Sequence, residues 1–103
     1  MLIARIWHGI LKSKSQAEEY AEYMSQTGVK ELQATQGNRG VYVLRRVEGA
    51  RAEFIFISLW ESFDAIRKFA GEDVEKAVYY PRDHDFLVEL ESKVTHFEVL
   101  VKP

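Results

Sequence analysis

Hydrophobic residues gather in blocks along the chain, and the clearest block covers residues 54–69. Residues 54–60 read FIFISLW, an apolar run that only Ser58 interrupts. β-Branched and aromatic residues favour strands, so this run predicts a strand that is covered on both faces. Ser62 then stands at a helix N-cap position, with Asp64 in the first turn. The predicted helix has one apolar stripe and ends at a glycine: Phe63, Ile66, Phe69, Ala70 and then Gly71. These residues could line a pocket or fill a core.

The start of the chain predicts a strand followed by a helix. Residues 2–12 read LIARIWHGILK. The even positions are more uniformly apolar, so we expect them to face helices, and the odd positions, which include Arg5 and Trp7, to face a wetter interior or an interface. Ser15 and Glu18 have the spacing of a capping box. The helix that they predict has one apolar face: Ala17, Tyr20, Ala21 and Met24.

The rest of the pattern predicts two more strands and a short helix. Residues 41–47 form a strand, and the turn at 48–51 joins it to the strand at 54–60 as a hairpin. Residues 72–78 are expected to form a short helix, and residues 94–101 the last strand. The order β-α-β-β-α-β predicts an α+β, ferredoxin-like fold with an antiparallel sheet, in a single domain over residues 1–103.

One face of that sheet would pack against the helices, and the other face is too apolar to be left in water. The residues expected on this second face are mostly aromatic: Trp7, Phe54, Phe56, Trp60 and Leu100. A second copy of the chain is the simplest cover. We therefore expect a two-fold homodimer with its sheets face to face, which gives a dimeric α/β barrel.

Composition narrows the classes of function. The 103 residues are 47% hydrophobic and carry a net charge of −2, with 14 scattered Lys and Arg. A nucleic-acid binder would show a basic patch, so no nucleic-acid partner is expected. No apolar stretch approaches the length of a membrane span, so no membrane partner is expected. The chain has no cysteine, which excludes disulfides and thiolate chemistry. We expect a cytoplasmic protein.

Three segments resemble a known family. Residues 57–65 read ISLWESFDA, residues 37–42 read GNRGVY, and residues 96–99 read HFEV. In these segments the chain resembles the antibiotic-biosynthesis-monooxygenase-like (ABM) domains of the dimeric α/β-barrel superfamily. The resemblance spans nearly the whole chain, and it supports the fold more specifically than any function.

The resemblance implies one of two chemistries. One is oxygenation of aromatic phenols, with molecular oxygen as co-substrate and no cofactor. The other is heme degradation, which in this family uses an Asn on the first strand, a Trp on the second helix and a His just beyond it. These positions correspond here to Trp7 or His8, to Phe69 and to Tyr79. Since none of the three residue types is retained, the resemblance favours the oxygenase over the heme-degrading protein. Tyr79 remains a chemically possible heme ligand.

Candidate residues follow from what an oxygenase of a small apolar or aromatic molecule requires: an apolar pocket, a base and a donor for a developing anion. The candidate catalytic residues are His96, Tyr79 and His8. The candidate substrate-binding residues are Trp7, Arg45, Phe69 and Tyr80.

Each of these residues also has a purely structural interpretation, as a packing, loop-anchoring or ion-pairing group. His84 lies between Asp83 and Asp85, but three adjacent residues rarely converge on one ion, so no metal site is expected. A non-catalytic dimer that binds a small ligand is therefore the main alternative to an oxygenase.

Overall fold

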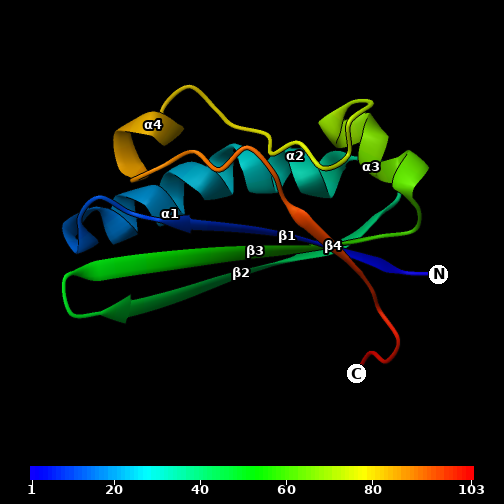
Figure 1. Ribbon diagram of the computed structural model, residues 1–103, viewed down its shortest axis with the longest axis horizontal. Coiled ribbons are helices and arrows are strands. Elements are labelled where there is room, and N and C mark those ends of the chain that lie inside the picture. Colours follow the sequence, from blue (N-terminus) through cyan, green and yellow to red (C-terminus); the bar gives the residue numbers. More distant parts are fainter.

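The computed structural model covers residues 1–103 and forms one four-stranded antiparallel sheet with the helices on one side of it (Figure 1). The spatial order of the strands is β2-β3-β1-β4. The strands are β1 (Ile3–Ile10), β2 (Asn38–Glu48), β3 (Arg51–Trp60) and β4 (Thr95–Glu98). The helices are η1 (Lys14–Gln16), α1 (Ala17–Gln26), α2 (Gly28–Ala34), α3 (Phe63–Ala70) and α4 (Asp83–Phe86). The predicted α+β, ferredoxin-like fold is confirmed. No helix combines the length and the apolar character needed to cross a membrane.

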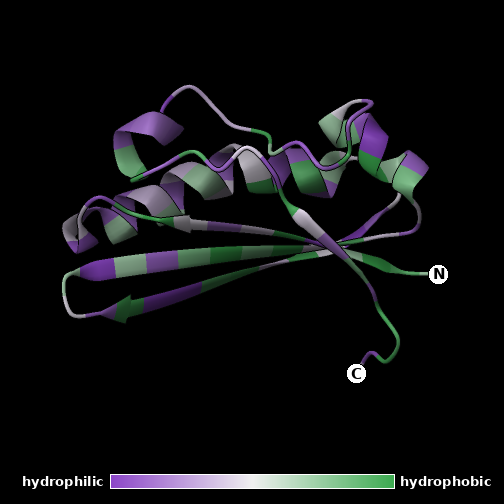
Figure 2. Cartoon of the chain, in the orientation of Figure 1, coloured by the Kyte–Doolittle hydropathy of each residue, from purple (hydrophilic) through white to green (hydrophobic).

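The strand and helix at residues 54–70 form as their pattern predicts. β3 lies between β1 and β2, and Figure 2 shows it as largely hydrophobic. Ser62 caps α3 by accepting a hydrogen bond from the backbone N–H of Ala65 at 3.1 Å, and the helix ends at Gly71, which has a φ of 89°. The capping box predicted for α1 is absent. Instead, Ser13 caps the preceding turn η1, and its hydroxyl accepts from the N–H of Ser15 at 3.3 Å.

The face assignment predicted for the sheet is wrong, because the odd positions of β1 face the helices. In the ladder between β1 and β3, Arg5 pairs with Ser58 and Trp7 with Phe56. Trp60 and Phe54 are also buried under the helices. Large aromatic side chains are needed to fill the space between a sheet and helices, and here their volume decides the face rather than the uniformity of the apolar pattern.

The opposite face of the sheet, here called the outer face, has no helix over it (Figure 1). Aliphatic side chains from β1 and β3 dominate its centre, together with exposed residues of the two outer strands. Its apolar members are Ala4, Ile6, Ile10, Ile55, Ile57, Leu59, Tyr42, Leu44 and Phe97. Leu100 was expected on the uncovered face of the sheet, but it lies beyond β4 and is 85% exposed.

The segment between α3 and β4 crosses the helix side of the molecule with little regular structure (Figure 1). The helix predicted at 72–78 does not form. Backbone hydrogen bonds hold the segment to itself and to β1: Ala77 N to Ser92 O at 2.9 Å, Val94 N to Glu75 O at 2.8 Å, and Val88 N to Ile10 O at 2.9 Å. The segment thereby forms one wall of the interior next to β1.

Candidate functional site

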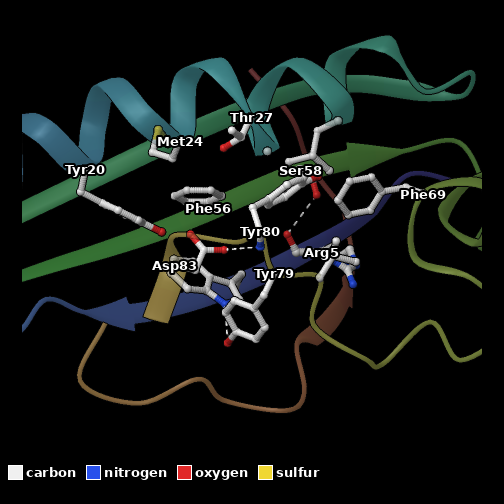
Figure 3. Close-up of a pocket in the computed structure, with 14 residues that line it drawn as sticks. Arg5, Tyr20, Met24, Thr27, Phe56, Ser58, Phe69, Tyr79, Tyr80 and Asp83 are labelled. Atoms are coloured by element: carbon white, nitrogen blue, oxygen red, sulfur yellow. Dashed lines mark hydrogen bonds between the residues drawn. The ribbon is translucent and has the colours of Figure 1, made fainter. Parts of the chain in front are cut away.

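A partly enclosed cavity lies between the helix-facing side of the sheet, the helices α1 and α2, and residues 78–83 (Figure 3). Its free volume is about 40 Å³, enough for one or more water molecules but well below the ~300 Å³ of a pocket for a drug-sized ligand. The lining residues come from every layer of the fold: Arg5, Trp7, Tyr20, Met24, Thr27, Gly28, Leu32, Phe56, Ser58, Phe69, Val78, Tyr79, Tyr80 and Asp83. Binding of an organic molecule would therefore require side chains to move.

Tyr79 is fixed in the wall of this cavity by two hydrogen bonds. Its hydroxyl accepts from Trp7 Nε1 at 3.1 Å and donates to the carbonyl of Glu91 at 2.6 Å. The Trp7 ring also packs against Phe56, with 4.8 Å between the ring centroids. Burial raises the pKa of the Tyr79 hydroxyl, so at neutral pH it is a neutral hydrogen-bonding group.

Asp83 supplies the only carboxylate in the cavity lining. It is 6% exposed, and its Oδ2 accepts from the backbone N–H of Tyr80 at 2.7 Å. Burial raises the pKa of Asp83 and outweighs the opposing effect of that hydrogen bond. The hydroxyl of Tyr80 donates to Glu31 Oε2 on α2 at 2.8 Å, which ties the segment at 78–83 to the helix layer. The raised pKa makes this carboxylate a stronger base than an exposed aspartate.

Arg5 lies at the other end of the cavity from Asp83 and Tyr20, next to Phe69 (Figure 3). Its side chain is on the buried face of β1 and the residue is 5% exposed. The Nη2 group donates to the carbonyl of Lys76 at 2.7 Å, whereas Nε has no hydrogen-bond partner. Burial lowers the pKa of Arg5 to about 10. The guanidinium therefore remains charged at neutral pH.

The structure brings four of the seven predicted site residues to this cavity: Trp7, Phe69, Tyr79 and Tyr80. His8 points to the outer face of the sheet, where its Nε2 lies 2.5 Å from Glu53 Oε2. Arg45 forms a surface ion pair with Glu18 at 2.7 Å. His8 and Arg45 do not line the cavity, because the strand alternation directs His8 away from the helices and Arg45 lies near the hairpin end of β2.

His96 also lies outside the cavity lining. It is half-buried on β4 opposite Arg5, and its ring contacts Phe63 edge-on at 5.4 Å between centroids. Burial, and then the positive charge of Arg5, lower the pKa of His96. It is consequently a neutral imidazole at pH 7, separate from the cavity.

Two polar residues of the cavity were not among the predicted site residues. Asp83 was considered with His84 and Asp85 only as a metal ligand, but it is buried, whereas its two neighbours have side chains that are 68% and 52% exposed. Arg5 and Trp7 are two residues apart in β1, so their side chains lie on the same face of the sheet. This spacing is the sequence signal that could have identified Arg5 as a cavity residue. No three His, Asp or Glu side chains are grouped closely enough to hold a metal ion.

No family model matches the chain, and no curated protein matches it. Several solved structures do match its fold. One is the heme-degrader MhuD from Mycobacterium tuberculosis with two hemes bound in its active site, at 19% identity, over 98% of both chains and with a TM-score of 0.62. The expectation that a protein of this fold needs no cofactor is therefore wrong, because a protein with the same architecture binds heme.

The residues of this cavity do not fit an axially ligated heme. No histidine lines the cavity, and Tyr79, the position that corresponds to the family histidine, has its hydroxyl engaged by Trp7 and Glu91. Its raised pKa also opposes the phenolate form that ligates iron. Trp7, Phe69 and Tyr79 do lie around one cavity, but their aromatic rings occupy much of the space there.

Two further structures give the same picture of the fold. A candidate antibiotic biosynthesis monooxygenase from Bacillus cereus is 13% identical, covers 99% of this chain and 98% of its own, and gives a TM-score of 0.67. A second Mycobacterium tuberculosis protein, Rv0793, is 15% identical over 99% and 98% of the two chains, with a TM-score of 0.64. The resemblance predicted from residues 57–65 is confirmed at the level of architecture. The chain has the ferredoxin-like fold of the antibiotic-biosynthesis-monooxygenase-like proteins.

Proposed function

We propose that the chain is a small monooxygenase that binds an aromatic or quinone-like compound in the cavity between sheet and helices. The observation that carries the proposal is the composition of the cavity lining: aromatic rings from β1, β3 and the segment at 78–83 surround a few polar groups. Ligand sites commonly combine apolar walls with a small number of convergent polar groups.

The polar groups have distinct roles in this proposal. Asp83 accepts the proton of a phenolic substrate, because its carboxylate is buried, has a raised pKa and faces the cavity. Tyr79 presents its ring to the substrate, and the hydrogen bonds of its hydroxyl with Trp7 and the Glu91 carbonyl hold that ring in one position. Loss of the proton makes the ring electron-rich, which favours its reaction with molecular oxygen.

The first test uses 1-naphthol as the probe and measures oxygen consumption and product. One 1-naphthol and one O₂ give one 1,4-naphthoquinone and one water, so one oxygen atom enters the ring and the substrate supplies the electrons. The assay is run with and without hemin, because a protein with this fold binds heme. We expect equal molar amounts of oxygen consumed and quinone formed above the rate without protein.

Two carboxylates close together in the chain provide a matched pair of variants for this assay. Asp83→Asn removes the buried carboxylate, whereas Asp85→Asn changes a side chain that is 52% exposed. We expect the Asp83 variant to lose at least tenfold in rate, in the range typical of losing a general base, and the Asp85 variant to match the wild type. Saturable binding of 1-naphthol without oxygen consumption would refute the oxygenase and leave the chain as a ligand-binding protein.

We also propose that a second copy of the chain covers the outer face of the sheet. Tyr42, Leu44 and Phe97 are 54%, 45% and 56% exposed there, around the half-buried aliphatic side chains of β1 and β3. A stable interface needs about 800 Å² per partner. The apolar residues of the outer face extend over all four strands, and we expect them to supply this area.

Sedimentation equilibrium tests this dimer. We expect the wild type to have about twice the 12.0 kDa of one chain, and Leu44→Glu to have the mass of a monomer because it places a charge on the outer face. Leu90→Glu is the matched control, since Leu90 is 43% exposed and lies near Asp73 and Lys76 in the segment between α3 and β4 that crosses the helix side of the molecule. A monomeric wild type at about 50 μM, well above the Kd of a typical stable dimer, would contradict the proposal.

A further inference from the structure

Arg5 is a buried cation for which the protein provides no anion. The residue is 5% exposed, and no carboxylate forms an ion pair with it. A charge is costly to bury unless it is paired and hydrogen-bonded. Natural proteins therefore rarely leave an arginine in this state without a further partner.

The contacts of Arg5 with the protein leave most of its hydrogen-bonding capacity unused. A guanidinium has five N–H donors, and one hydrogen bond is formed, from Nη2 to the Lys76 carbonyl at 2.7 Å. The ring of Phe69 lies 5.5 Å from the guanidinium carbon, a contact that holds the group without satisfying its donors. The Nε group is buried and has no partner. The free donors are therefore available to a ligand in the cavity.

The other charged or titratable groups near Arg5 do not neutralise it. His96 faces it from β4 and is held neutral by its surroundings. Glu75 is near enough to His96 to affect its pKa, but it forms no ion pair with Arg5. Asp83 lines the same cavity and bonds to the Tyr80 N–H instead. The cavity thus has an unpaired positive end at Arg5 and a separate proton-accepting group at Asp83.

We propose that Arg5 binds a carboxylate carried on an aromatic ring, so that the ligand of this cavity is an aromatic carboxylate rather than a neutral hydrocarbon. A guanidinium matches the planar geometry of two oxygens bidentately, and Phe69 and Trp7 supply aromatic surface in the same cavity. The inference rests on the proposed function only in taking this cavity as the ligand site, and it does not depend on oxygen chemistry.

The test compares two probes of nearly equal shape, salicylate and salicylamide, by isothermal titration calorimetry at constant ionic strength. Salicylate carries a carboxylate where salicylamide carries a neutral amide. We expect the wild type to bind salicylate at least tenfold more tightly, in keeping with a charge-assisted bidentate contact.

The control variants act on the charge of Arg5. Arg5→Gln is expected to abolish the preference for salicylate, whereas Arg5→Lys keeps the charge and should retain part of it. Circular dichroism shows which variants are folded. If Arg5→Gln does not fold, the comparison between the wild type and Arg5→Lys still tests the role of Arg5. Equal affinity of the wild type for the two probes, absence of binding of both, or a preference that survives in Arg5→Gln would overturn the inference. If salicylate preference holds while 1-naphthol is not oxidised, the oxygenase fails and the anion site stands.

Discussion

Replacement of Tyr79 by Phe tests how firmly the cavity wall is held. The change removes only a hydroxyl, but that hydroxyl accepts from Trp7 Nε1 at 3.1 Å and donates to Glu91 O at 2.6 Å. Each hydrogen bond contributes about 1 kcal/mol net. Trp7 is 9% exposed, so its Nε1 would lose its acceptor in a largely dry environment. We expect the free energy of unfolding to fall by about 2 kcal/mol, and Tm to fall by roughly 10 °C for a domain of this size.

Chemical denaturation of a double-mutant cycle measures this effect and assigns it to the Trp7–Tyr79 pair. We expect Tyr79→Phe and Trp7→Phe to be coupled by about 1 kcal/mol, the range for residues in direct contact. Tyr42→Phe is the matched control, because Tyr42 is 54% exposed on the outer face, and exposed substitutions usually change stability by less than about 0.5 kcal/mol. A Tyr79→Phe loss no larger than that of Tyr42→Phe, without coupling, would show that the hydrogen bonds do not fix the wall.

Three other changes test separate parts of the structure. Trp60→Glu should prevent folding, because Trp60 is 0% exposed and its Nε1 donates to Ser58 Oγ at 2.8 Å; a folded variant by circular dichroism would refute that placement. Burial raises the pKa of Asp83, so the stability that Asp83 contributes should fall as pH rises from about 4, its pKa in the unfolded chain, to its higher pKa in the folded protein. Denaturation of the wild type and of Asp83→Asn at several pH values measures this contribution, which the variant should lack. Gly37→Ala should cost more stability than Gly49→Ala by urea denaturation: both glycines have positive φ, but only at Gly37 would the new Cβ meet Ala65 Cβ, at 2.4 Å.

The regular elements could be predicted from the sequence because their signals are local. The apolar run of β3, the Ser62 cap and the Gly71 stop all act within a few residues of where they stand. The buried face of α1, with Tyr20 and Met24, follows from helical spacing alone. Local patterns of this kind were sufficient for the order of the elements and therefore for the fold.

The face of β1 could not be predicted from its own pattern. Both sets of alternate positions contain apolar residues, so the choice depended on which set fills the space under the helices. Trp7 pairs with Phe56 there, and their rings form one aromatic layer. The even positions, with Ala4 and Ile6, leave too little volume for that role and lie on the outer face.

The cavity could not be predicted, because one of its walls is the segment between α3 and β4, where the pattern of hydrophobic residues is weakest. A short helix was expected at 72–78, but the segment is held by distant backbone partners such as Lys12, whose N–H donates to Phe86 O at 2.8 Å. These long-range bonds decide that Tyr79, Tyr80 and Asp83 face the interior. Residue types alone indicated the tyrosines as candidates, whereas the burial of Asp83 required knowledge of the tertiary structure.

Amide chemical-shift mapping shows whether a small aromatic molecule binds between the sheet and the helices. ¹⁵N-labelled protein is titrated with 1-naphthol, and the shifts are compared between the cavity and the outer face. We expect binding in the cavity, with saturable shifts centred on the amides of Trp7, Gly28, Phe56 and Tyr79, all of which line the cavity. Shifts confined to the outer-face strands around Tyr42 and Phe97, or no saturable shifts, would contradict it.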